Sequence, residues 1–149
     1  MLRMIGQNYR MTEITAAIAR EQVKKGREII RQRNFWARLL INNLEITPGY
    51  QVKPVTKTNA CYVLPIRVDA SVRDQMVKGL QERGVPVRAG YGGPLYNLPA
   101  FKPYARECPN CERIEKELII MQMYSHFLDE EIIDQITEAF IGVSDAVIR

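Results

Sequence analysis

The sequence contains few of the residues that build disulfide frameworks and metal sites. Its 149 residues include three cysteines and one histidine. An odd cysteine count argues against a disulfide framework and favours a reducing compartment. No apolar run approaches the roughly 20 residues of a membrane-spanning helix, and residues 1–10, MLRMIGQNYR, lack the apolar core of a signal peptide. We therefore expect a soluble, cytoplasmic protein with no membrane partner.

The sequence also lacks the motifs of several enzyme classes. It contains no Ser-His-Asp pattern, no HExxH and no pair of carboxylates at a recognisable catalytic spacing. The segment Gly90-Tyr-Gly-Gly has neither the spacing nor the Gly-Lys-Ser/Thr ending of a phosphate-binding loop. His126 stands alone, and we interpret it as a loop residue that forms a hydrogen bond. These motifs therefore identify no catalytic residue.

Two cysteines have the spacing of half a zinc site, in Cys108-Pro-Asn-Cys111. The other soft ligands are Cys61 and His126, which form no second pair, so a zinc site is disfavoured. A redox role is also disfavoured, because the strand that precedes the motif in thioredoxin is missing. We expect buried or half-buried, inert thiols and no metal site.

The apolar content is sufficient for a single core. Hydrophobic residues make up 46% and charged residues 26% of the chain, as in ordinary soluble globular proteins. A chain of this length buries about two-thirds of its unfolded surface. We predict one domain over residues 1–149.

The net charge of +4 is unevenly distributed, because residues 1–38 carry nine basic and three acidic side chains. Two interpretations are open: a solvated helix face, partly compensated by Glu21 and Glu28 at i,i+4 spacing, or a surface that binds RNA or a phosphorylated ligand. No aromatic residues interleave with the basic ones, so we favour the solvated face and expect no nucleic-acid partner. The clustered basic residues are Arg20, Lys24, Lys25, Arg27, Arg31, Arg33 and Arg38.

Apolar periodicity predicts a long helix in the first third of the chain. Thr12 is a suitable N-cap, with Glu13 in the first turn, and apolar positions continue at helical spacing to about Leu44. Gly26 costs about 1 kcal/mol relative to alanine in a helix interior, so we expect a kink or a join there. Pro48-Gly49 then predicts a turn.

Shorter elements are predicted next. Residues 60–68 form a β-rich stretch, in which Pro65 favours an edge position or a bulge because it has no amide donor. Ser71 is a candidate N-cap for a helix to about Arg83, and Gly84 is suited to end it. Residues 85–88 then read as a short strand.

Residues 89–104, AGYGGPLYNLPAFKPY, contain three glycines, three prolines and four aromatic residues. This composition predicts a loop with fixed turns, and binding residues often lie on such loops. A tyrosine-lined pocket and a purely structural hinge remain equally open. Arg88, beside the loop, is suited to clamp a carboxylate or a phosphate.

The last part of the chain predicts two helices around an extended piece. The first begins at Pro109 or Asn110 and continues to about Ile119, and Asp129 is the expected cap of the second. The order helix, strand, helix, strand, loop, helix, helix predicts an α+β fold of helices packed on a small sheet. The apolar stripe of the last helix is Ile132, Ile133, Ile136, Phe140 and Val143.

Residues 6–25, GQNYRMTEITAAIAREQVKK, closely resemble a signature of the DegT/StrS-type sugar aminotransferases, which use pyridoxal phosphate. Residues 84–88, 93–96, 99–101, 108–112, 123–124 and 129–131 resemble later segments of that family in the same order. The family's Gly-x-Asn-x-Arg segment and the helix start that follows it match Gly6, Asn8, Arg10, Met11, Thr12, Glu13, Ala16 and Ala17.

The resemblance implies the small C-terminal domain of a fold-type-I aminotransferase, with a long N-terminal helix and a mainly antiparallel sheet. In that family the enzyme is a dimer, and the matching asparagine reaches the cofactor phosphate of the neighbouring subunit. Asn8 would take that role, and Arg10 would contact the phosphate or substrate or fix the turn. Arg88, Tyr91 and Tyr96 would then bind the substrate, a keto-sugar attached to a nucleotide.

The sequence departs from the family at some positions. Tyr96 stands where relatives often carry histidine, and Gln122 and Ser125 stand where proline is common. The Schiff-base lysine of the family lies upstream of the Gly-x-Asn-x-Arg segment, and no lysine here occupies a matching motif. We therefore expect this chain to be incomplete for catalysis and to bind no pyridoxal phosphate alone.

We consider three possible functions for this chain. The first is the C-terminal domain or a fragment of a sugar aminotransferase, with a homodimer or a large cofactor domain as its partner. The second is a non-catalytic binding or assembly module that keeps the small-domain fold. The third, ranked last, is RNA binding through the basic helix.

Overall fold

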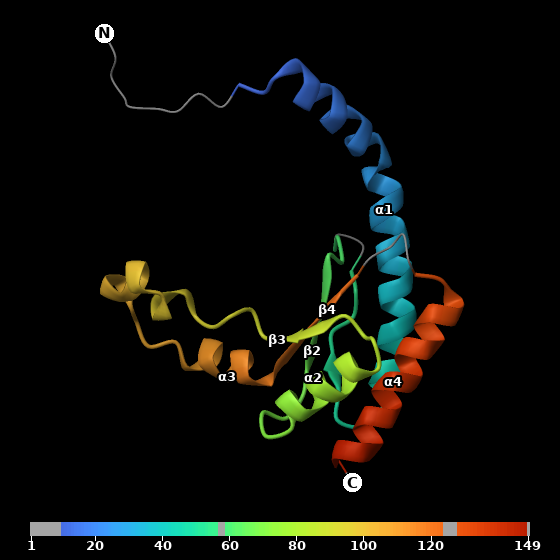
Figure 1. The fold of residues 1–149 in the computed structure, drawn as a ribbon, viewed down its shortest axis with the longest axis vertical. Helices are drawn as coiled ribbons and strands as arrows, with labels where there is room; N and C mark the ends of the chain where they lie inside the picture. The colour runs from blue at the N-terminus through green and yellow to red at the C-terminus, as the bar shows by residue number, and fades with distance from the viewer. Residues whose placement is uncertain (1–9, 57–58, 124–127, 149) are drawn as a thin grey trace.

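A computed structural model describes residues 10–56, 59–123 and 128–148. It confirms the α+β class, with helices packed on a small antiparallel sheet (Figure 1). In chain order the elements are α1 (Glu13–Glu45), β1 (Gln51–Val52), β2 (Val63–Arg67), α2 (Arg73–Glu82), β3 (Val87–Ala89), the 3-10 helices η1 (Leu95–Asn97) and η2 (Pro99–Tyr104), α3 (Pro109–Glu117), β4 (Leu118–Gln122) and α4 (Glu130–Ile148).

Helix α1 begins as the sequence predicts and is much longer than the body that it packs against. The Thr12 side chain caps it by accepting a hydrogen bond from the Thr15 amide at 3.3 Å. The expected join at Gly26 is wrong, since one helix continues through it to Glu45. Its buried residues begin only at Asn34, so the first half of α1 projects beyond the sheet (Figure 1).

The sheet has the strand order β1-β2-β4-β3, and all three pairings are antiparallel. Pro65 was expected on an edge strand, and this is wrong, because its strand β2 lies between β1 and β4. However, β1 pairs only with Arg67 and Ile66, so Pro65 is in register with a single residue, Ile120 of β4. The missing amide donor of proline is tolerated there because β1 ends before reaching it.

Strand β4 is buried along almost its whole length. Ile119 and Met121 belong to the main core together with Ile66 of β2. Successive strand residues point to opposite faces, so Leu118 and Ile120, which are also buried, face away from that core. A strand that is apolar on both faces belongs inside a sheet, where β4 is found.

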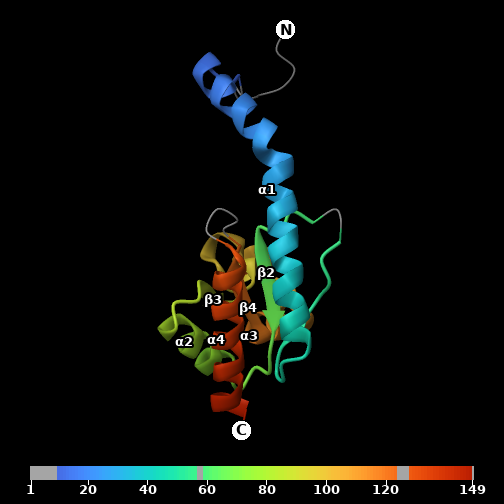
Figure 2. The same ribbon diagram turned by 90° about the vertical axis from the view of Figure 1, so that its right-hand side faces the viewer.

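Helices α1, α2 and α4 cover one face of the sheet, and α1 and α4 lie side by side in front of it (Figure 2). Asn43 of α1 donates to Thr137 Oγ1 of α4 at 3.1 Å, and the Tyr50 hydroxyl donates to the Phe140 carbonyl at 2.9 Å. The apolar side chains that these helices bury are Ala37, Leu40, Ile41, Leu44, Met76, Val77, Leu80, Ile133, Ile136, Ala139, Phe140 and Val143.

The helix ends follow the predicted signals with one exception. Asp129 caps α4 by accepting from the Ile132 amide at 2.8 Å, and Gly84, at φ +78°, follows the end of α2. The predicted cap at Ser71 is wrong, since the N-cap position of α2 is Val72, which makes no side-chain bond. The Ser71 amide instead donates to Asp69 Oδ1 at 2.8 Å. Ser71 is therefore part of a local turn at Asp69 and does not cap α2.

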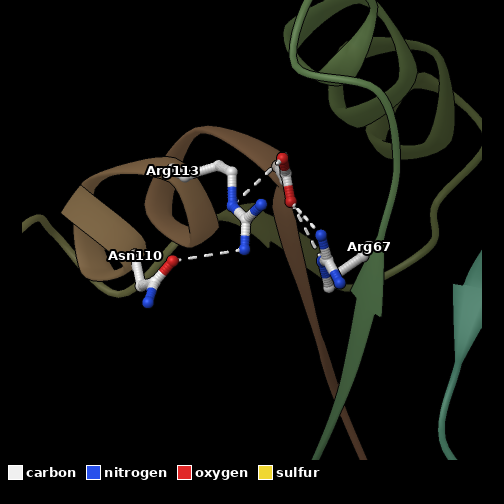
Figure 3. A network of polar contacts seen from close by, with 4 residues as sticks. Arg67, Asn110 and Arg113 are labelled. Carbon is white, nitrogen blue, oxygen red and sulfur yellow. Dashed lines mark hydrogen bonds and ion pairs between the residues drawn. The ribbon is translucent and has the colours of Figure 1, made fainter.

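The junction of α3 and β4 is held by a polar network (Figure 3). Helix α3 ends at Glu117, two residues before the predicted end, and β4 starts at the next residue. The Glu117 side chain is only 17% exposed and pairs with Arg67 of β2 and with Arg113 of α3. Arg113 also contacts Asn110 Oδ1 at 3.4 Å. These contacts tie the end of α3 to the sheet.

None of the helices described in the structure is long and apolar enough to cross a membrane.

Replacing a fully buried side chain of α1 tests whether its second half belongs to the core. Leu40 has no exposed surface, and we expect Leu40→Ala to lower the free energy of unfolding by about 2–5 kcal/mol. Ile46, 85% exposed, serves as the control, and Ile46→Ala should change it by less than about 0.5 kcal/mol. Urea denaturation measures both; equal effects would contradict the packing described.

A double-mutant cycle tests the α3–β4 junction. We expect a coupling of about 1 kcal/mol between Arg67→Met and Glu117→Gln, because the carboxylate is largely buried while the arginine is part-exposed. The coupling should shrink in high salt, since solvent reaches the arginine. Urea denaturation of the four proteins measures it, and strictly additive effects would argue against the ion pair.

Candidate functional site

The candidate site lies where β3 runs into the loop that the sequence singles out. Arg88 is in register with Ile120 of β4, so its side chain is on the sheet face opposite α1, α2 and α4. Its guanidinium lies over the Tyr91 ring, 4.9 Å from the centroid, and Nη1 donates to the Gly90 carbonyl at 3.2 Å. Tyr91 is 60% exposed. The structure therefore brings Arg88 and Tyr91 together on an accessible face.

A carboxylate of α3 holds the glycine-rich turn of this loop. The amides of Tyr91, Gly92 and Gly93 donate to the Glu115 side chain at 3.0, 3.1 and 2.8 Å. Gly90 has a φ of +49°, and a Cβ atom there would lie 2.1 Å from Glu115 Oε1. The turn therefore needs glycine at position 90 for both its backbone conformation and its approach to the carboxylate.

The environment of Glu115 favours its charged form. Partial burial works to raise the pKa of this carboxyl, but the three amide donors, Tyr91, Gly93 and Gly92, and the positive charge of Arg73 outweigh it. The net result is a pKa below the ordinary value. Glu115 is therefore an anion at neutral pH, bound by a row of backbone donors.

Tyr96 is held by a second carboxylate of the same helix. Its hydroxyl donates to Glu112 Oε1 at 2.7 Å. This bond to a carboxylate is the main reason that the pKa of Tyr96 rises to about 12. Tyr96 is thus neutral at physiological pH and oriented by α3, while Tyr91 pairs with Arg88.

Tyr91 also borders a cleft of about 620 Å³ between the loop and the segment that leads into β2. Tyr62, Val63 and Pro65 line the same cleft. Its volume is in the range of small-molecule sites, which are typically about 300–1,000 Å³. The alternative in which the tyrosine-rich loop lines a pocket is therefore supported for Tyr91.

Of the two residues expected to contact the cofactor, the structure describes Arg10, which lies away from this loop. Asn8 is outside the residues that the structure describes, and Arg10 is exposed just before the cap of α1. The distance along α1 from Glu13 to Asn34, its first buried residue, is about 30 Å at the usual rise per residue. The structure thus does not bring Arg10 together with Arg88.

Most of the basic side chains on α1 are exposed. Lys24 pairs with Glu21 and Arg31 with Glu28, both at 2.7 Å and both on exposed surface. These two ion pairs have i,i+3 spacing, whereas i,i+4 spacing was expected. Arg33 lies closer to the body, 5.9 Å from the centre of the Tyr62 ring.

The expected burial of the thiols is wrong for two of them. Cys108 and Cys111 are exposed because they lie at the start of α3, a helix that buries none of its residues, while Cys61 is half-buried. Burial raises the pKa of the Cys61 thiol. Within the described ranges no three cysteine, histidine or acidic side chains come together as a metal site. His126 falls outside the described residues.

The contacts of Glu112 and Glu115 with the loop were not predicted from the sequence. The available signal was a pair of acidic residues three positions apart on a predicted helix, downstream of a glycine-rich loop. Such a pair is normally an exposed helix face, and only the folded loop supplies its partners.

Comparisons with known proteins identify the family of this chain. The model of the DegT/DnrJ/EryC1/StrS aminotransferase family matches residues 1–140. No match is found among curated protein sequences. An aminotransferase, TlmJ, from Streptoalloteichus hindustanus is 26% identical, with a TM-score of 0.79 over 91% of this chain and 37% of its own.

Two further structures share the fold. An aminotransferase from Psychrobacter cryohalolentis has a TM-score of 0.85 and 22% identity over 99% of this chain and 42% of its own. Helicobacter pylori PseC, an aminotransferase of pseudoaminic acid biosynthesis, has a TM-score of 0.83 and 18% identity over 98% of this chain and 41% of its own. The chain thus spans about two-fifths of the length of these structures.

The family model covers nearly the whole sequence, and the order and packing of the elements agree with those of the solved aminotransferases. This chain belongs to the DegT/DnrJ/EryC1/StrS aminotransferase family.

Proposed function

We propose that this chain is the C-terminal part of a cytoplasmic, pyridoxal-phosphate-dependent aminotransferase that acts on nucleotide-linked keto-sugars, and that it is incomplete for catalysis alone. The observation that carries the proposal is the family match over residues 1–140. The limited share of each solved aminotransferase that the chain covers, 37–42% in the three structures described, supports a division of the site between this chain and a further region.

The described residues do not fit the cofactor by themselves. A Schiff-base lysine must be held close to the cofactor in a protected site, so that its amine is directed at the carbonyl carbon. Every described lysine is exposed, and Lys24 and Lys78 pair with neighbouring glutamates on the helix surface. The lysine and most of the cofactor site are therefore assigned to the further region.

The proposed role of this chain is to bind and orient. Arg88 supplies a fixed positive charge for an anionic group of the substrate, and Tyr91 supplies an aromatic face beside it. Tyr96, held by Glu112, completes the substrate-binding set. These side chains belong to one loop and the strand before it, which supports their acting on one ligand.

Asn8 and Arg10 are proposed to serve a different active site. They precede α1, whose first buried residue, Asn34, lies about 30 Å along the helix from Glu13, so they can reach a cofactor phosphate held by a neighbouring subunit. An amide and a guanidinium are both suitable phosphate donors. This arrangement requires a homodimer or association with a large cofactor domain.

An assembly module without catalysis is the second candidate. The exposed apolar residues Ile14, Ile18 and Val23 on the first half of α1, with Met11 just before it, favour a partner for this helix. The DNA upstream separates the two candidates: a reading frame that encodes the lysine-bearing region supports the aminotransferase, and its absence supports the module.

The isolated chain should not form a Schiff base with the cofactor. After incubation with pyridoxal phosphate and borohydride reduction, we expect an unmodified intact mass, because none of the lysines that the structure describes lies in a protected site. The chain supplemented with the lysine-bearing region should gain one adduct, on that region. A single stable adduct on one lysine of the isolated chain would contradict the proposal.

Removing the charge at Arg88 tests the substrate-binding set in the completed enzyme. We expect Arg88→Met to raise KM for the nucleotide-linked keto-sugar about tenfold, a loss of about 1.4 kcal/mol, with a smaller effect on kcat. Arg106→Met, on the exposed segment before α3, is the control. Steady-state kinetics decide, and equal KM values for Arg88→Met and the parent enzyme would remove Arg88 from the set.

A further inference from the structure

We propose that Glu115 and Glu112 of α3 are positioning residues that set the conformation of residues 90–97 and thereby hold Arg88, Tyr91 and Tyr96 in place for the nucleotide-linked substrate. The effect on the loop follows from the contacts of this chain alone. The effect on substrate binding rests on the proposed function.

The loop has little apolar burial to hold it in one conformation. Neither η1 nor η2 contains a buried residue. Leu95, Phe101 and Tyr104 are 67%, 46% and 79% exposed. The segment extends away from the sheet on the side of α3 (Figure 1). Because apolar contacts contribute little here, the conformation of the loop depends mainly on its turns and polar bonds.

Glu115 supplies the largest set of such bonds. Its carboxylate accepts from three consecutive amides, those of Tyr91, Gly92 and Gly93, at 2.8–3.1 Å. Three amides converge only because Gly90 and Gly92 adopt positive φ values, at +49° and +98°. Bonds from amides to an ionised carboxylate are stronger than neutral ones.

Glu115 is itself fixed to the core. Helix α3 continues directly into β4, and Arg73 of α2 donates from Nη1 to the Glu115 carbonyl at 3.1 Å. The Gly90 amide donates to the Leu118 carbonyl at 2.8 Å, which anchors the start of the loop at the same point. The buried strand β4 thus fixes the position of α3, and α3 in turn fixes the conformation of the loop.

Glu112 holds the second tyrosine from the same helix face. Residues three apart on a helix are neighbours, so Glu112 and Glu115 face the loop together. The bond from the Tyr96 hydroxyl to Glu112 fixes the ring that follows the glycine turn. The pair therefore acts at two points, the backbone at 91–93 and the side chain at 96.

The consequence reaches Arg88 through Tyr91. The guanidinium stacks on this ring and also donates to the Gly90 carbonyl, both of which lie at the turn that Glu115 holds. Releasing the turn removes the fixed position of the ring and of the carbonyl. Arg88 then samples more orientations, and a bound anion must order it again.

Amide hydrogen exchange on the whole chain, followed by NMR, tests the loop directly. We expect the amides of residues 91–93 to exchange at least about tenfold faster in Glu115→Ala than in the parent chain, with core amides unchanged. Glu115→Gln, which keeps the size of the side chain, should give a smaller change in the same direction. Glu107→Ala, on the exposed segment before α3, is the matched control.

The pH dependence provides a second readout that a general loss of stability would not produce. Because the folded pKa of Glu115 is lowered, its bonds to the loop are complete above the ordinary carboxyl range and are lost as pH falls through the folded pKa. The amide shifts of residues 91–93 should follow one titration below the ordinary glutamate value. Arg73 of α2 and the Arg88–Tyr91 pair are the titratable or charged neighbours on the packed elements.

These measurements decide the effect on the loop. Unchanged exchange at 91–93 in Glu115→Ala, or a titration that persists in Glu115→Gln, overturns the proposal. If Glu115→Ala does not fold, the Gln variant and the titration of the parent chain give the same decision.

Kinetics on the enzyme completed with its lysine-bearing region decide the effect on substrate. We expect Glu115→Gln and Tyr96→Phe each to raise KM for the nucleotide-linked keto-sugar several-fold, with smaller changes in kcat and unchanged thermal melting. Faster loop exchange with unchanged KM overturns substrate positioning. If the completed parent enzyme transaminates no such sugar, the proposed function fails, while the loop measurements still stand or fall on their own.

Discussion

The buried strand β4 is the element on which the rest of the structure depends. It pairs with β2 on one side and β3 on the other, and Leu118–Met121 are buried on both faces. Three helices pack on one of these faces, and α3 leads into the strand without a connecting residue. A fully apolar strand can be stable only inside a sheet, and this requirement places β3 and its Arg88 beside it.

The position of the candidate site follows from this arrangement. Glu117 ties the end of α3 to Arg67 of the sheet, and two residues earlier Glu115 binds the glycine-rich loop. The exposed loop is therefore ordered by polar contacts to a helix that the core holds. Such a loop can hold Tyr91 beside Arg88 of β3 although its helices η1 and η2 contain no buried residue.

Helix α1 has two structurally different parts. Its second half packs on the sheet beside α4, whereas its first half carries exposed apolar and basic side chains beyond the core. The family's cofactor-contact motif precedes that exposed half. The length of α1 from Glu13 to Asn34, about 30 Å, separates Arg10 from Arg88 within one copy of this chain.

The sequence alone determined the features that depend on neighbouring residues: the caps at Thr12 and Asp129, the stop at Gly84, the helical stripes and the ordered motifs of the aminotransferase family. Each reflects backbone bonding or side-chain spacing within a few positions. The tertiary structure decided the interior place of Pro65 and the partners of Glu115, because both depend on which strands and helices pack together. The Ser71 cap was lost for a local reason, the competing turn at Asp69. Contacts between residues more than 20 positions apart leave no pattern in the local sequence, so they could not be predicted from it.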